Sequence, residues 1–72
     1  MNSYLLQIKP IKEINLDFFY QEISAIIETF KTDVEETKLL RIPATNCILL
    51  TSNNIKLRFA LSKNQNYIAT PY

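Results

Sequence analysis

The stretch NLDFFYQEISAIIETFK, residues 15–31, decides the fold, because its apolar residues recur with the period of an α-helix. Asn15 occupies the N-cap position, while Asp17 in the first turn and Lys31 in the last turn carry the charges that the helix dipole favours. We therefore expect a helix from Leu16 to about Lys31. Its large apolar side chains fall in one stripe about 120° wide that suits packing on a sheet: Leu16, Phe19, Tyr20, Ile23, Ile26, Ile27 and Phe30.

Phe18 is the one aromatic residue of this helix that falls outside the stripe. Either it folds back onto residues 10–14, or it is offered to a partner as an interface anchor. Both readings stay open at this level.

The segment before the helix has strand periodicity. Residues 4–9, YLLQIK, place Tyr4, Leu6 and Ile8 on one side and Leu5, Gln7 and Lys9 on the other. Pro10 ends this strand or confines it to a sheet edge. Leu5, an apolar residue on the polar side, is a candidate interface residue.

The second half of the chain predicts further strands. Cys47–Thr51 is rich in aliphatic residues, and 55–61 alternates strictly, which predicts a hairpin that turns at 52–54. In this hairpin Ile55, Leu57, Phe59 and Leu61 face inward, and Lys56, Arg58 and Ala60 face outward. A looser turn at 64–66 leads to a last strand, Tyr67–Thr70. The chain has no glycine, so asparagines in these turns are expected to take any positive φ.

Residues 32–43 are ambiguous. Asp33 with Glu36 resembles a capping box for a short helix, whereas Lys38–Ile42 equally fits a strand that enters Pro43. We favour a turn and then a short strand. The fold class is therefore α+β, a single small domain over residues 1–72. One amphipathic helix packs on one face of a mainly antiparallel sheet of three to four strands, in the order β-α-β-β-β.

The composition excludes several classes of function. The chain has no histidine, no glycine and one cysteine, so the usual general base, zinc sites and phosphate-binding glycine loops are missing. We expect no enzyme, no metal and no cofactor. Cys47 is expected to be a packing residue, and the pairs Glu35–Glu36 and Glu22–Glu28 do not converge within a helix. A ribonuclease site built from Lys56, Arg58, Lys63 and Tyr67 would lack a preorganised base and acid.

Size and cysteine content bear on stability and location. A core built from 72 residues rarely supplies more than roughly 3–5 kcal/mol, so a small domain without disulfides or metal often gains support from a partner. No apolar run approaches the roughly 20 residues of a membrane-spanning helix, and no secretory signal is visible. The unpaired Cys47 favours a reducing compartment, so we expect a cytoplasmic protein with no membrane contact.

The charge is strongly divided along the chain. All seven acidic residues precede residue 37, whereas five of the eight cations follow it. The chain is therefore bipolar despite a net charge of +1. The abundance of Asn, Ile, Lys and Tyr is typical of AT-rich genomes, including those of phages and mobile elements.

Three functions fit these observations. The first is a small non-enzymatic binding protein, such as an inhibitor, adaptor or assembly factor, that acts through a protein–protein interface at Leu5 and Phe18. The second is nucleic-acid binding by the basic C-terminal hairpin, with Lys56, Arg58 and Lys63 on phosphates and Tyr67 stacked on a base. The third is a homo-oligomeric structural subunit in which the acidic helix of one copy meets the basic sheet of the next, or strand edges pair.

Overall fold

The computed structural model describes residues 3–31 and 36–72 of the chain. Asp33 and Glu35, which entered two of the sequence predictions, lie outside these ranges. The elements follow in the order β1 (Tyr4–Pro10), α1 (Leu16–Phe30), β2 (Thr37–Ile42), a short 3-10 helix η1 (Pro43–Thr45), β3 (Cys47–Ser52), α2 (Ile55–Ser62) and β4 (Tyr67–Pro71). The short strand expected at 38–42 is thus confirmed as β2.

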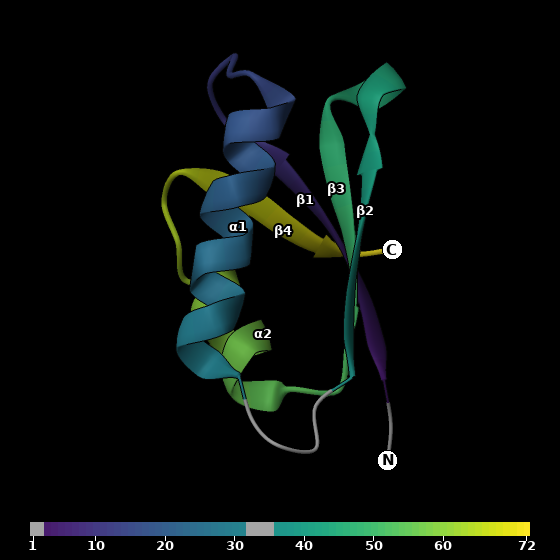
Figure 1. The fold of residues 1–72 in the computed structure, drawn as a ribbon, viewed down its shortest axis with the longest axis vertical. Coiled ribbons are helices and arrows are strands. Elements are labelled where there is room, and N and C mark those ends of the chain that lie inside the picture. Colours follow the sequence, from purple (N-terminus) through teal and green to yellow (C-terminus); the bar gives the residue numbers. More distant parts are fainter. Residues whose placement is uncertain (1–2, 32–35) are drawn as a thin grey trace.

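The four strands form one sheet in the order β2-β3-β1-β4, and every neighbouring pair is antiparallel. Two β-α-β units interleave in this sheet: β3 lies between β1 and β2, and β1 lies between β3 and β4. This is the split β-α-β topology of ferredoxin-like folds. Both helices lie on the same side of the sheet (Figure 1). The predicted α+β class with a mainly antiparallel sheet is confirmed.

Helix α1 begins and ends close to the predicted positions. The Asn15 side chain caps it, because its Oδ1 accepts hydrogen bonds from the backbone N–H groups of Asp17 at 2.9 Å and Phe18 at 3.2 Å. The helix ends at Phe30, and Lys31 is the C-cap. Phe19 and Ile23 are its buried side chains, which places the predicted stripe against the sheet.

The core fills the space between the sheet and the two helices. Its buried members are Leu6 and Ile8 of β1, Ile48 and Leu50 of β3, Phe19 and Ile23 of α1, Leu57 and Leu61 of α2, and Tyr67 of β4. The rings of Phe19 and Tyr67 meet edge to face with centroids 5.9 Å apart. Every element except β2 and η1 therefore contributes a buried side chain to one core.

The prediction of a strand at 55–61 is wrong, because these residues form helix α2. Leu57 and Leu61, one helical turn apart, are buried at 0% and 1% exposure, whereas Ile55 and Phe59 point outward at 67% and 61%. The Asn54 side chain caps α2 by accepting the N–H of Leu57 at 3.0 Å. A hairpin of β3 with 55–61 therefore does not exist. The hairpin that forms joins β2 to β3, with Ile42 opposite Cys47.

The expectation that asparagine takes positive φ is met at a position that we did not predict. Asn46, in the β2–β3 hairpin, has φ of 51°, and it is the one non-glycine residue with positive φ in the ranges described. The asparagines at 53–54 and 64–66 do not adopt this conformation. Asn53, Asn54 and Asn64 accept hydrogen bonds through their side chains instead, as Asn64 does from the N–H of Asn66 at 2.7 Å.

Candidate protein-interaction surfaces

Helix α2 carries large apolar side chains on both of its sides. Leu57 and Leu61 enter the core, while Ile55 and Phe59, also one turn apart, face solvent. Three cations flank the outward pair, and α2 contains no acidic residue. We call this group the α2 surface: Ile55, Lys56, Arg58, Phe59 and Lys63.

Two of these cations, Arg58 and Lys63, make cation–π contacts with aromatic rings of the chain. The Lys63 Nζ lies 4.2 Å from the centroid of the Phe59 ring, and the Arg58 Cζ lies 5.1 Å from the centroid of the Tyr4 ring. Such cation–π contacts contribute about 0.5–1 kcal/mol at exposed sites. They also restrain the side chains, so the charges are held next to the apolar pair.

Hydrogen bonds around Asn54 fix the start of α2 to the rest of the fold. The Asn54 Nδ2 donates to the carbonyl oxygen of Phe30 at 2.7 Å, and its backbone N–H donates to Ser52 Oγ at 3.0 Å. The Tyr4 hydroxyl donates to the carbonyl oxygen of Asn54 at 2.6 Å. Helix α2 is thereby tied to α1, β3 and β1, so the α2 surface is presented on a rigid element.

A second apolar surface lies on the sheet face opposite the helices, where no element of residues 3–31 and 36–72 covers it (Figure 1). The register makes Leu40 and Leu49 direct cross-strand neighbours and places Gln7 beside Leu49. The Tyr72 N–H donates to the carbonyl oxygen of Leu5 at 3.0 Å, which extends the face beyond β4. We call this group the open sheet face: Leu5, Leu40, Ile42, Leu49, Ile68 and Tyr72.

Phe18 is separate from both surfaces. Its side chain is 54% exposed on the outside of α1, so it stays out of the core as the helical projection predicted. The preceding residue, Asp17, accepts a hydrogen bond from Arg41 of β2 at 2.6 Å, and the Arg41 guanidinium lies 4.2 Å from the Tyr20 ring centroid. One acid of α1 is therefore already paired within the chain.

Tyr67, expected to stack on a base, is instead a core residue with 5% exposure. Burial raises the pKa of its phenol, the Asn64 side chain opposes this shift, and the Glu22 carboxylate adds to it. Despite the nearby Asn64, the hydroxyl oxygen makes no hydrogen bond within the described part of the chain. The ring is thus unavailable for a nucleic-acid base.

Cys47 is buried, as expected for a packing residue. Its sulfur lies 3.0 Å from Thr45 Oγ1 and accepts a 3.6 Å hydrogen bond from Gln7 Nε2. These neighbours come from the hairpin and from β1. The thiol is therefore a structural contact at the end of β3.

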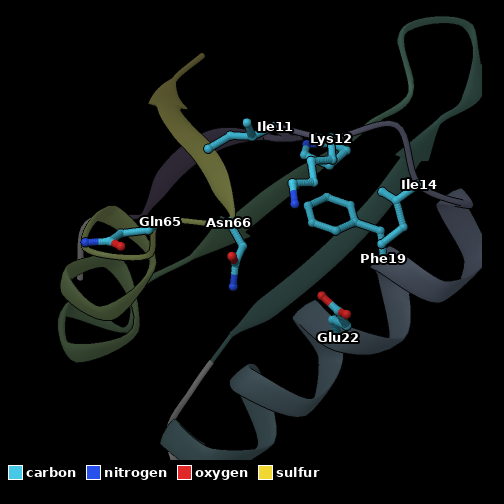
Figure 2. Close-up of a pocket in the computed structure, with 8 residues that line it drawn as sticks. Ile11, Lys12, Ile14, Phe19, Glu22, Gln65 and Asn66 are labelled. Carbon is cyan, nitrogen blue, oxygen red and sulfur yellow. The ribbon is translucent and has the colours of Figure 1, made fainter.

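A half-open cavity of about 230 Å³ lies between the β1–α1 loop, α1 and the α2–β4 loop (Figure 2). Ile11, Ile14 and Phe19 supply apolar walls, and Lys12 and Glu22 enter from opposite sides. A hydrogen bond of 3.2 Å from the Ile11 N–H to the carbonyl oxygen of Asn66 joins the two loops that line the cavity. The cavity is below the roughly 300–1,000 Å³ of ordinary ligand sites.

The structure divides the predicted site residues among four places. Lys56, Arg58 and Lys63 come together on α2, Leu5 lies on the open sheet face, Phe18 stands on α1 and Tyr67 is in the core. Sequence reasoning missed Ile55 and Phe59, because the strand assignment turned them inward. It also missed Leu40 and Ile68, because the strand order was unknown.

The described residues contain no group of three or more Asp, Glu, Cys or His side chains placed to hold a metal ion. Neither helix described is long and apolar enough to cross a membrane. No family model, curated protein or solved structure matches the chain. A ferredoxin-like topology alone assigns no function, since this fold serves many.

Proposed function

We propose that this is a small, non-enzymatic, cytoplasmic binding protein that docks through the α2 surface onto an acidic and partly apolar surface of another protein. The observation that carries the proposal is the outward pair Ile55 and Phe59, 67% and 61% exposed, flanked by three cations and no acid on an eight-residue helix. A solvent-facing helix side normally carries polar residues instead.

The energetics favour Phe59 as the anchor. Burying a Phe or Ile side chain contributes about 1.5–3 kcal/mol, and aromatic residues are enriched among the residues that dominate interface energies. The contact with Lys63 restrains the Phe59 ring, which reduces the entropy lost on binding. The cations supply charge complementarity, which speeds association with an acidic partner.

Nucleic acid is the competing partner, because residues 37–72 carry five cations and no acid. The folded structure offers less support for nucleic-acid binding than for protein binding. The Tyr67 ring is buried, and two cations of the α2 surface already contact the chain's own aromatic rings. A helix surface centred on two apolar side chains also suits a protein partner better than a phosphate backbone.

Affinity capture from the source cell tests the proposal with two matched variants. Phe59→Ser removes the anchor from α2, and Phe18→Ser removes an equally large and similarly exposed ring from α1. We expect a protein that is captured by the wild type and by Phe18→Ser, and lost with Phe59→Ser. Both variants should unfold at nearly the wild-type temperature, since neither side chain belongs to the core.

Nuclease treatment before capture separates the two partner classes. Capture that survives nuclease and weakens steeply with Phe59→Ser supports the proposal. Capture that nuclease abolishes assigns the surface to nucleic acid, and capture lost with Phe18→Ser alone moves the interface to α1. Either of these results overturns the proposal.

A further inference from the structure

The open sheet face carries more large apolar side chains than the solvated face of a sheet usually does. In an antiparallel sheet with one buried face, the other face usually carries polar side chains. Here Leu40 is 58% exposed, Ile68 is 56% exposed and Tyr72 is 73% exposed, and all three lie on the uncovered side with Leu5. The apolar side chains lie on β1 and toward both edges of the sheet, and the polar Gln7, Thr51 and Thr70 lie on the same face between them.

The charges on this face indicate what kind of occupant it fits. In the register, Lys38 lies at the outer edge strand and Lys9 lies in the row of Ile42 and Ile68, and the face carries no acid among the residues described. Its large apolar side chains outnumber these two cations, so the face suits a largely apolar partner. It contrasts with the α2 surface on the opposite side of the molecule, where cations surround the apolar pair.

The face is large enough for a stable interface between two copies. The Cα trace measures 34 × 21 × 19 Å, and the sheet face runs along the longest axis, so it presents on the order of 650 Å². A standard interface buries roughly 600–1,000 Å² per partner. A partner that covers the whole face therefore reaches this size, whereas a short peptide would leave much of the apolar area exposed.

Sheet geometry supplies a way for identical faces to meet. Two twisted sheets pack face to face about 10 Å apart, with strand directions about 30° from each other. A two-fold axis within the interface brings the same side chains from both copies together and closes the assembly at two chains. The long Lys9 and Lys38 side chains can extend to solvent at the rim while their stems remain over the apolar surface.

From these observations we propose that the open sheet face binds a second copy of this chain, forming a two-fold dimer whose two sheets pack face to face. The helices then point outward on both sides, so the dimer presents two α2 surfaces at a fixed spacing. The proposal does not depend on the proposed function, because it concerns the other side of the molecule. A dimer would also cover apolar area that one 72-residue core leaves exposed.

Sedimentation equilibrium of the full chain at roughly 5–200 micromolar tests the proposal. We expect a species of twice the 8.4 kDa chain mass that dissociates on dilution. Leu40→Glu places a carboxylate within the interface, on the edge strand β2, and should return the protein to one chain. Phe59→Glu makes the same kind of change at a similarly exposed position on α2 and should leave the dimer intact.

A second variant keeps the test decisive if Leu40→Glu disturbs folding. Ile68→Glu alters the opposite edge strand, β4, at a residue that is 56% exposed, and circular dichroism establishes that each variant is folded. Folded monomers from either sheet variant, beside a dimeric Phe59→Glu, support the proposal. A wild type that stays monomeric at the highest concentration overturns it and leaves the face to a different occupant. A dimer that Phe59→Glu dissociates also overturns it, because the helices would then form the interface.

Discussion

The side-chain amide of Asn54 donates a 2.7 Å hydrogen bond to the carbonyl oxygen of Phe30, which joins the first turn of α2 to the last turn of α1. Asn54 is only 8% exposed, and the same side chain accepts the N–H of Leu57. One residue therefore satisfies a free donor of one helix and a free acceptor of the other. This link fixes how the acidic helix and the basic helix lie on the sheet.

Substitution of Asn54 should separate these two roles. Asn54→Ala loses both hydrogen bonds and should lower the free energy of unfolding by about 1–3 kcal/mol in urea denaturation. Asn54→Asp keeps an acceptor for Leu57 but has no amide N–H for Phe30, so it should also be less stable than the wild type at neutral pH. An Asn54→Asp protein as stable as the wild type would show that the link to Phe30 contributes nothing.

Tyr67→Phe should stabilise the protein. The Tyr67 hydroxyl is buried without a hydrogen-bond partner among the described residues, and such a group costs stability. Removing it should raise the free energy of unfolding by about 1 kcal/mol at pH 7. Tyr72→Phe is the control, since Tyr72 is 73% exposed and its hydroxyl is expected to be solvated. A loss of stability in Tyr67→Phe would mean that the hydroxyl has a favourable partner after all.

The same variant should change the response to alkaline pH. Burial raises the folded-state pKa of Tyr67 above the ordinary value of 10.0, so the unfolded chain releases this proton first. The free energy of unfolding of the wild type therefore does not depend on this group below pH 10.0. It falls as the pH rises from 10.0 through the raised pKa, because the unfolded chain ionises more readily. The stability gap between Tyr67→Phe and the wild type should widen above pH 10.0, and a gap that stays constant would contradict this.

The two isoleucines at the centre of the α1 stripe should differ in their response to truncation. Ile23 is fully buried, whereas Ile26 is only partly buried at the edge of the core. Ile23→Ala should lower the free energy of unfolding by about 2–5 kcal/mol, and Ile26→Ala by less. Equal losses in urea denaturation would show that the outer flank of α1 is packed as tightly as its centre.

These residues show how far the sequence predicts the fold. Helix α1 was predictable because its fifteen residues repeat the helical period four times and Asn15 marks its start. The segment 55–62 is only two turns long, and Leu57 and Leu61 fall on the buried side in both a strand and a helix. Ile55 and Phe59 distinguish the two, since they face inward in a strand and outward in the helix. The signals that favour a helix were the Asn54 cap and good helix formers such as Lys56, Leu57 and Arg58.

The interaction surfaces were less predictable, because they depend on which strands become neighbours. Leu5 was recognised as apolar on the polar side of its strand, and its exposure on the open sheet face agrees with this. Leu40 and Leu49 form an apolar pair only because β2 lies beside β3. The local period of either strand carries no information about that pairing. Cross-strand neighbours follow from the strand order, and this order could not be predicted while residues 55–61 were assigned to a strand.

Charge reversal on α2 should slow association with the protein partner. Lys56 and Arg58 lie on the two flanks of the Ile55–Phe59 pair, so the double substitution Lys56→Glu, Arg58→Glu changes the charge around the apolar centre by four units without altering Leu57 or Leu61. Electrostatic steering acts mainly on the association rate, whereas the apolar anchor acts mainly on dissociation. In surface plasmon resonance the double variant should therefore associate at least about tenfold more slowly at low salt, with the difference shrinking as salt rises.

Phe59→Ser should show the complementary behaviour, with faster dissociation and a wild-type salt dependence. The control is Lys9→Glu, Lys38→Glu, which makes the same change in net charge on the opposite side of the molecule. If net charge alone attracted the partner, both double variants would associate slowly. If the α2 surface is the docking site, the sheet variant should associate at a rate close to that of the wild type, because its substitutions lie on the sheet face that points away from the helices. If the association rate fell equally in the two double variants, α2 would be excluded as the docking site.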